Sequence, residues 1–143
     1  MEGLWRTWII VWCWGTLAFG AAFAGVAFPA TSGPSAFYTE LVSGGRIDAA
    51  ALEAEGMRFA LALIGAVMMG WAVTIFGVVR AADQVGAYLW RMLTFGLIVW
   101  FAVDSWISVA AGYPLNAVGN TGFVALYLIP VLASGVLREA APA

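Results

Sequence analysis

Four long apolar stretches are the feature that most constrains the fold of this chain. A bilayer core about 30 Å thick is crossed by roughly 20 helical residues, and such stretches lie near residues 8–28, 58–79, 87–111 and 122–137. Only 10% of the side chains are charged, against roughly 25% in soluble domains. We therefore predict an all-α, polytopic integral membrane protein, with four transmembrane helices in an antiparallel bundle that forms one membrane domain over residues 1–143.

The longest segment between spans, residues 30–57, is predicted to be a partly helical outer loop. Residues 35–42 follow turn-forming residues and combine polar with apolar side chains, which favours a short helix at the membrane interface. Asp48 is suited to cap the alanine-rich stretch 49–55, which we expect to continue into the second span. Residues 112–120 are uncharged and rich in turn formers, so they are expected to form a loop.

Arginine placement predicts the orientation. If the N-terminus lies inside, four of the six arginines also lie inside: Arg6, Arg80, Arg91 and Arg138. Arg46 and Arg58 then lie outside, which satisfies the positive-inside rule. We therefore expect a protein of the bacterial inner (cytoplasmic) membrane with both termini in the cytoplasm.

The residue inventory argues against several classes of function. The chain has no histidine and one cysteine, Cys13, so an internal disulfide, a His-containing metal site, bis-histidine haem ligation and a His-based triad are excluded. A net charge of −2 without a basic patch argues against nucleic-acid binding. We accordingly predict no catalytic residues, no metal and no cofactor.

Asp104 lies inside the third span and needs an explanation. A carboxylate in a bilayer costs about 2.5–3.5 kcal/mol on insertion scales, so it is expected to have polar partners. Ser108 lies four residues on, on the same helical face. Further candidates on the same side of the membrane are Arg58, Asn116 and Asn120. These five residues are the predicted ligand- or ion-binding site, and the alternative is a structural polar network that fixes helix register.

Small residues at regular spacing predict where the helices pack closely. The second span carries Ala62, Ala66 and Gly70, and the first carries Gly15 and Ala22. We expect these two stripes to meet within one chain, with a contact between two copies of the chain as the alternative.

The fourth span contains Pro130, which has no N–H and leaves the Leu126 carbonyl without its helical donor. Inside a bilayer that carbonyl needs another partner. The deeper tryptophans, Trp71, Trp100 and Trp106, are interpreted as packing residues or as a wall for a ring-shaped ligand.

These observations favour a non-catalytic accessory or assembly subunit of a larger membrane complex, energetic or photosynthetic. Its wide apolar surface would then be covered by lipid and by other membrane protein subunits or a second copy of itself. The alternatives are a small oligomeric transporter or channel, and a hydrophobic-ligand-binding protein, both using Asp104.

Overall fold

The computed structural model describes residues 1–54 and 56–138, and its regular elements there are helices. Four are long and apolar enough to cross a membrane: α1 (Gly3–Ala24), α3 (Met57–Val85), α4 (Ala87–Ala110) and α5 (Pro114–Ala133). Between α1 and α3 lie one more α-helix and three 3-10 turns: η1 (Gly25–Ala27), η2 (Pro29–Thr31), α2 (Gly33–Ser43) and η3 (Ala49–Glu53). The prediction of four helices able to cross a membrane is thus confirmed by their length and composition, and the short helix predicted over residues 35–42 is present as α2.

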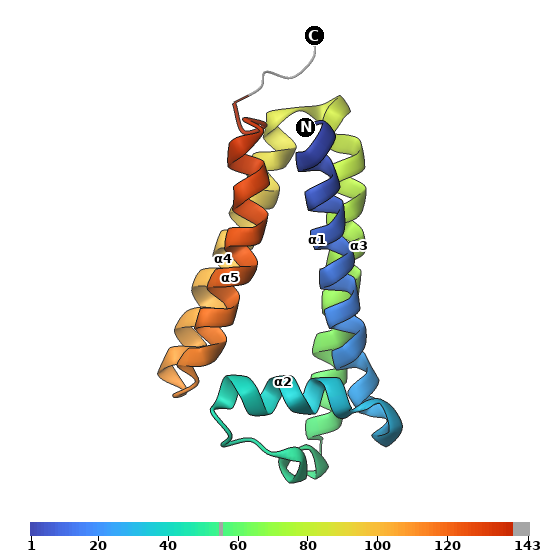
Figure 1. The fold of residues 1–143 in the computed structure, drawn as a ribbon, viewed down its shortest axis with the longest axis vertical. Coiled ribbons are helices and arrows are strands. Elements are labelled where there is room, and N and C mark those ends of the chain that lie inside the picture. The colour runs from blue at the N-terminus through green and yellow to red at the C-terminus, as the bar shows by residue number, and fades with distance from the viewer. Residues whose placement is uncertain (55, 139–143) are drawn as a thin grey trace.

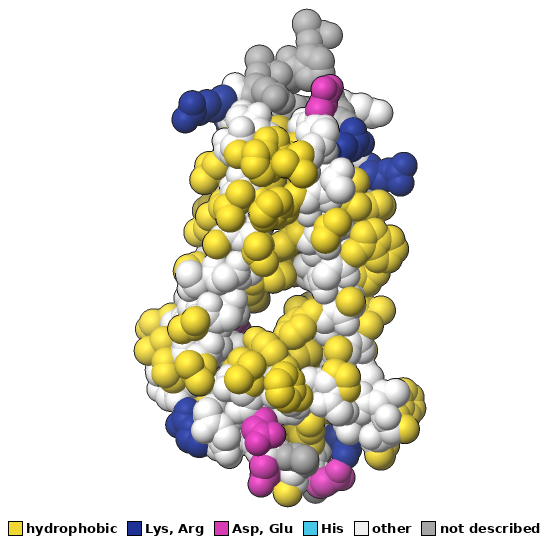
Figure 2. All heavy atoms as spheres, viewed as in Figure 1, with side chains coloured by type: hydrophobic (Ala, Val, Ile, Leu, Met, Phe, Trp, Pro, Cys, Tyr) yellow, Lys and Arg dark blue, Asp and Glu magenta, His cyan; other side chains and the backbone are white. Residues whose placement is uncertain are grey.

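The four long helices form two pairs that meet at one end and spread apart at the other (Figure 1). α1 packs along α3, and α4 packs along α5. α2 lies crosswise at the wide end and reaches from one pair to the other. We call this the α2 end, and the opposite end, where α1 begins and α5 ends, the terminal end. The space-filling view shows an opening between the pairs that α2 borders (Figure 2).

The contact between α1 and α3 is closest at two glycines that lie outside the predicted stripes, Gly20 and Gly65. Gly20 and Gly65 are both buried, and a Cβ added to Gly65 would stand 2.6 Å from the Gly20 carbonyl oxygen. The predicted stripes do not make this contact. A Cβ added to Gly15 or Gly70 would have no atom within 4 Å, and Ala66 is exposed.

The reason lies in helical geometry. Residues four apart are displaced by about 40° around a helix of 3.6 residues per turn, so a row with this spacing turns away from a straight neighbour. Ala62 and Ala22 are accordingly only half-buried, while the rest of the α3 row faces outward. The seam between α1 and α3 follows Gly65 instead.

Two tryptophans of α1 form hydrogen bonds that link the two helix pairs. The Trp8 indole Nε1 donates to the Leu126 carbonyl at 2.9 Å, the carbonyl that Pro130 leaves without a helical N–H. The Trp12 Nε1 donates to the Phe123 carbonyl at 3.2 Å. The partner that the Leu126 carbonyl needs inside a bilayer is thus a side chain of the opposite pair.

Aromatic rings fill the region where the pairs meet. The Trp71 ring on α3 lies 5.8 Å from that of Trp100 on α4 and 6.3 Å from that of Phe123 on α5. The Trp12 ring on α1 lies 4.6 Å from Phe123. Two of the deep tryptophans therefore act in packing, whereas Trp106 is 71% exposed.

The fourth span begins earlier than predicted. α5 starts at Pro114 rather than near residue 122, so residues 114–120 are helical and not a loop. Proline suits a first helical turn, because its φ is already helical and the missing N–H would have no helical acceptor there. This earlier start places Asn116 and Asn120 on a helix.

The segment before α3 also differs from its prediction. Asp48 does act as a cap, and its carboxylate accepts the Ala51 N–H at 3.0 Å. The capped element is only the 3-10 turn Ala49–Glu53, and Gly56, with φ of 78°, separates it from α3. The predicted continuation into the second span is therefore wrong, and Glu55 lies outside the described residues.

Candidate functional site

Asp104 lies near the α2 end of α4, half-buried against α5. Its Oδ2 accepts a hydrogen bond from Asn116 Nδ2 at 3.1 Å and a second one from Asn120 Nδ2. The two asparagines lie four residues apart on α5 and therefore share one face of that helix. Of the predicted partners, both asparagines are thus brought to the carboxylate.

Two serines complete the same network. Asn116 Nδ2 also donates to Ser108 Oγ at 2.9 Å, and Asn120 Nδ2 donates to Ser105 Oγ at 3.3 Å. The Ser108 hydroxyl in turn donates to the Asp104 carbonyl at 2.7 Å. Asn120 is 6% exposed and Ser108 is 8% exposed, so these two members of the network are buried within the protein.

Tyr38 connects α2 to this network. Its hydroxyl donates to Asn116 Oδ1 at 3.2 Å, which orients the amide of Asn116 so that its N–H groups face Asp104. The Tyr38 ring packs edge-on against Phe19 and Phe23 of α1, at 4.8 and 5.6 Å between ring centroids. Burial, and next the negative charge of Asp104, raise the pKa of Tyr38 above its ordinary value of 10.0.

We expect Tyr38→Phe to lower the free energy of unfolding by about 1 kcal/mol near neutral pH, because it removes one hydrogen bond. Since the folded protein favours the protonated phenol, the contribution of this group to stability is complete below about pH 10 and is lost as pH rises through the higher folded pKa. Unfolding in detergent at about pH 8 and pH 10.5 measures both effects. The stability gap between wild type and variant should narrow at the higher pH, and an unchanged gap would contradict the assignment.

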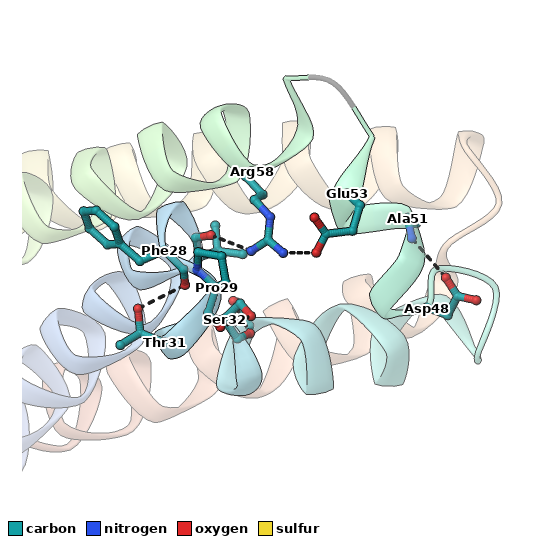
Figure 3. Close-up of polar contacts among 10 residues, drawn as sticks. Phe28, Pro29, Thr31, Ser32, Asp48, Ala51, Glu53 and Arg58 are labelled. Atoms are coloured by element: carbon teal, nitrogen blue, oxygen red, sulfur yellow. Dashed lines mark hydrogen bonds and ion pairs between the residues drawn. The ribbon is translucent and has the colours of Figure 1, made fainter.

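Arg58, the predicted cationic partner, lies outside the network. Its Nη1 donates to the Val26 carbonyl at 3.1 Å, and its Nη2 pairs with the Glu53 carboxylate (Figure 3). Because α1 ends in the turn η1, a backbone carbonyl stands within reach of Arg58. The expected contact with Asp104 is therefore not made.

The other arginine at the α2 end also has different partners. Arg46 donates to the Gly112 carbonyl, and its guanidinium carbon lies 4.6 Å from the centre of the Tyr113 ring. Among the described hydrogen bonds and ion pairs, Asp104 Oδ2 is reached only by the two amides, which are neutral donors. The described part of the chain contains no group of three or more His, Cys, Asp or Glu side chains placed to hold a metal.

Sequence reasoning missed Ser105 and Tyr38. Ser105 directly follows Asp104, but helix periodicity directs attention to Ser108, because neighbours in sequence point about 100° apart. Tyr38 lies on the short helix that was predicted at the interface, and only the crosswise placement of α2 brings its hydroxyl to Asn116.

Comparisons with protein-family models, with curated proteins and with solved structures find no match.

The geometry of the site indicates which chemical group Asp104 can bind. The described hydrogen bonds to the Asp104 side chain all reach Oδ2, none of them engages Oδ1, and the residue is only half-buried. A carboxylate already held by neutral amides is suited to a positively charged group.

Proposed function

We propose that the protein is a non-catalytic accessory or assembly subunit of a larger membrane complex, and that Asp104 binds a basic side chain from a transmembrane segment of a partner. The observation that carries this proposal is a carboxylate within a helix able to cross a membrane. Its described partners are neutral, and it lies where α2 reaches the α4–α5 pair. Ionised groups within membranes commonly pair with an opposite charge, because each alone is costly there.

The shape of the protein supports the same proposal. The two helix pairs are joined by the tryptophan contacts and spread toward the α2 end, where the opening lies (Figure 2). A partner segment placed there would contact both pairs and bring its charge close to Asp104. The four long helices also keep much of their apolar surface exposed, with large side chains such as Phe59, Val67 and Phe95 more than 60% exposed.

Orientation belongs to this proposal. The terminal end carries Arg6, Arg80, Arg91 and Arg138, and the α2 end carries Arg46 and Arg58. We place the terminal end in the cytoplasm of a bacterial cell and α2, with the rest of the 30–57 segment, at the outer face of the inner membrane. In this orientation the long helices alternate in direction across the bilayer as an antiparallel bundle.

A second candidate is the binding or transport of a small amphiphilic cation at Asp104. The observation that favours it is the aromatic group where the two helix pairs meet, made of Trp71, Trp100 and Phe123. Aromatic faces attract organic cations and also accommodate apolar groups. Such a ligand would reach the site from the lipid between the helix pairs.

One experiment tests both candidates. The wild-type protein and its Asp104→Asn variant are extracted gently from their own membranes, and the native mass, the co-migrating chains and the extracted small molecules are identified. Under the first proposal, wild type runs within a larger complex, and the variant loses about tenfold or more of its partner, because a charge-assisted contact is removed.

The control is Glu40→Gln, which removes one negative charge from an exposed position on α2. This variant should keep the partner. A wild-type protein that retains an organic cation, lost only from Asp104→Asn, would replace the first proposal with the second. Equal composition in all three proteins would overturn the binding role of Asp104 in both proposals and leave it as part of a structural polar network, and a wild-type protein that runs without other chains would overturn the accessory-subunit proposal.

A further inference from the structure

A second site lies on the opposite helix pair, where α3 begins. A pocket of about 400 Å³ is lined by the start of α3, the turn η3, residues between these two elements, and the turn η1 that follows α1: Ala27, Leu52, Glu53, Ala54, Gly56, Arg58, Phe59 and Ala62. Its position at the beginning of a membrane-crossing helix places it at the level of lipid headgroups. From the residues that line it, we propose that this pocket binds a phosphate-bearing anion. The surrounding residues favour the headgroup of an anionic phospholipid as the source of that phosphate.

Arg58 is the residue that would recognise the phosphate. Its side chain is 20% exposed, and the bond from Nη1 to the Val26 carbonyl, 3.1 Å long, holds the guanidinium at the pocket (Figure 3). The described contacts use the two terminal nitrogens, one bond each, out of five N–H groups on a guanidinium. A guanidinium matches a phosphate with two parallel hydrogen bonds, so the fixed orientation suits this ligand.

Glu53 occupies the position that the phosphate would take. Its carboxylate pairs with Arg58, but its side chain is 67% exposed. An exposed ion pair contributes only about 0–1 kcal/mol, so a second anion can replace it at small cost. We infer that Glu53 turns into solvent when the anion binds.

The remaining walls favour a lipid over a free anion. Leu52 is buried, and Phe59 is 68% exposed on the first turn of α3. Ala62 lines the pocket one turn further along α3, and Leu63 beside it is 50% exposed. An apolar surface thus runs from the pocket along the membrane-crossing helix, as an acyl chain attached to the phosphate would require. This site does not involve Asp104, so the inference is independent of the proposed function.

The test measures lipid retention by native mass spectrometry of the full chain in detergent. Phosphatidylglycerol is compared with diacylglycerol of the same acyl chains, which lacks the phosphate. We expect about tenfold weaker retention of diacylglycerol, and the same loss of phosphatidylglycerol in Arg58→Gln, since one charge-assisted contact is removed. Arg58→Lys should retain part of the binding, because it keeps the charge but not the fork geometry.

Two further variants complete the design. Glu53→Gln should strengthen phosphatidylglycerol retention by removing the competing carboxylate. Arg80→Gln, at an exposed arginine of the terminal end, should leave it unchanged. Thermal unfolding of each variant verifies that it is folded, and the Glu53→Gln result stands alone if Arg58→Gln does not fold.

Inorganic phosphate is the third probe. If inorganic phosphate displaces phosphatidylglycerol at millimolar concentration, and by itself binds with an affinity similar to that of phosphatidylglycerol, the site takes free phosphate and the lipid source is rejected. If it does not compete, the lipid source is supported. Equal retention by Arg58→Gln and Arg80→Gln, or weaker retention by Glu53→Gln, would overturn the phosphate site itself.

Discussion

Gly65→Ala is expected to lower the free energy of unfolding by about 1–3 kcal/mol, although alanine is the better helix former. The added Cβ would stand 2.6 Å from the Gly20 carbonyl oxygen and 2.7 Å from the Phe23 carbonyl carbon, and closer still to the Ala24 nitrogen. These are backbone atoms of α1, so they can yield only if the two helices move apart. The loss of close packing then extends beyond the substituted residue, because helix contacts in lipid depend on close backbone approach.

The matched control is Gly70→Ala on the same helix. Nothing lies within 4 Å of a Cβ at Gly70, so this change should be neutral or should stabilise α3 by up to about 1 kcal/mol. Of the two substitutions, only Gly65→Ala is therefore expected to destabilise the protein. Denaturant unfolding in detergent, followed by tryptophan fluorescence, measures both. Equal effects at the two positions would show that Gly65 does not form the seam between α1 and α3.

Asn120→Leu is expected to cost about 2–3 kcal/mol, because it removes a donor to a charged acceptor and leaves Asp104 less satisfied. Asn120 is 6% exposed, and its amide donates to Asp104 Oδ2 and to Ser105 Oγ. The control is Thr121→Val, at an exposed neighbour whose hydroxyl donates only to the Ala117 carbonyl of its own helix among the described bonds. That control should change stability by less than about 0.5 kcal/mol.

A double-mutant cycle separates the contribution of the contact from that of burial. In an Asp104→Leu background, Asn120→Leu should cost at least about 1 kcal/mol less than in wild type, because the acceptor is already absent. Additive losses in denaturant unfolding would mean that the amide does not stabilise the carboxylate. The cycle measures the structural role of the network, whereas the partner experiment with Asp104→Asn measures its proposed role in binding.

Much of the candidate site was accessible from sequence. An acid within an apolar span requires polar partners, and Ser108, Asn116 and Asn120 were expected to be near Asp104 because they lie on one side of the membrane. The structure does bring these residues together. Because residues 112–120 were predicted to form a loop, the placement of Asn116 and Asn120 on one face of a helix was not predicted. The turn-forming residues were given more weight than the suitability of Pro114 for a first helical turn.

Arg58 shows where such reasoning stops. A long cationic side chain on the same side of the membrane is an expected partner for Asp104. Hydropathy, however, does not show which of several acceptors at the same level of the membrane Arg58 contacts. In the structure Arg58 instead contacts a backbone carbonyl of η1, the turn that follows α1, and the Glu53 carboxylate. The pairing was decided by which helices neighbour each other.

The sequence by itself determined that the chain folds into four helices able to cross a membrane, with a short helix between the first two. That result rests on local properties, since a span needs only enough consecutive apolar residues and internally satisfied backbone groups. Only the tertiary structure decided that Gly20 meets Gly65, that Tyr38 reaches Asn116 and that the helices form two pairs. These contacts join residues far apart in the chain, and they depend on the distance between backbones and on where each helix begins, which no local periodicity specifies.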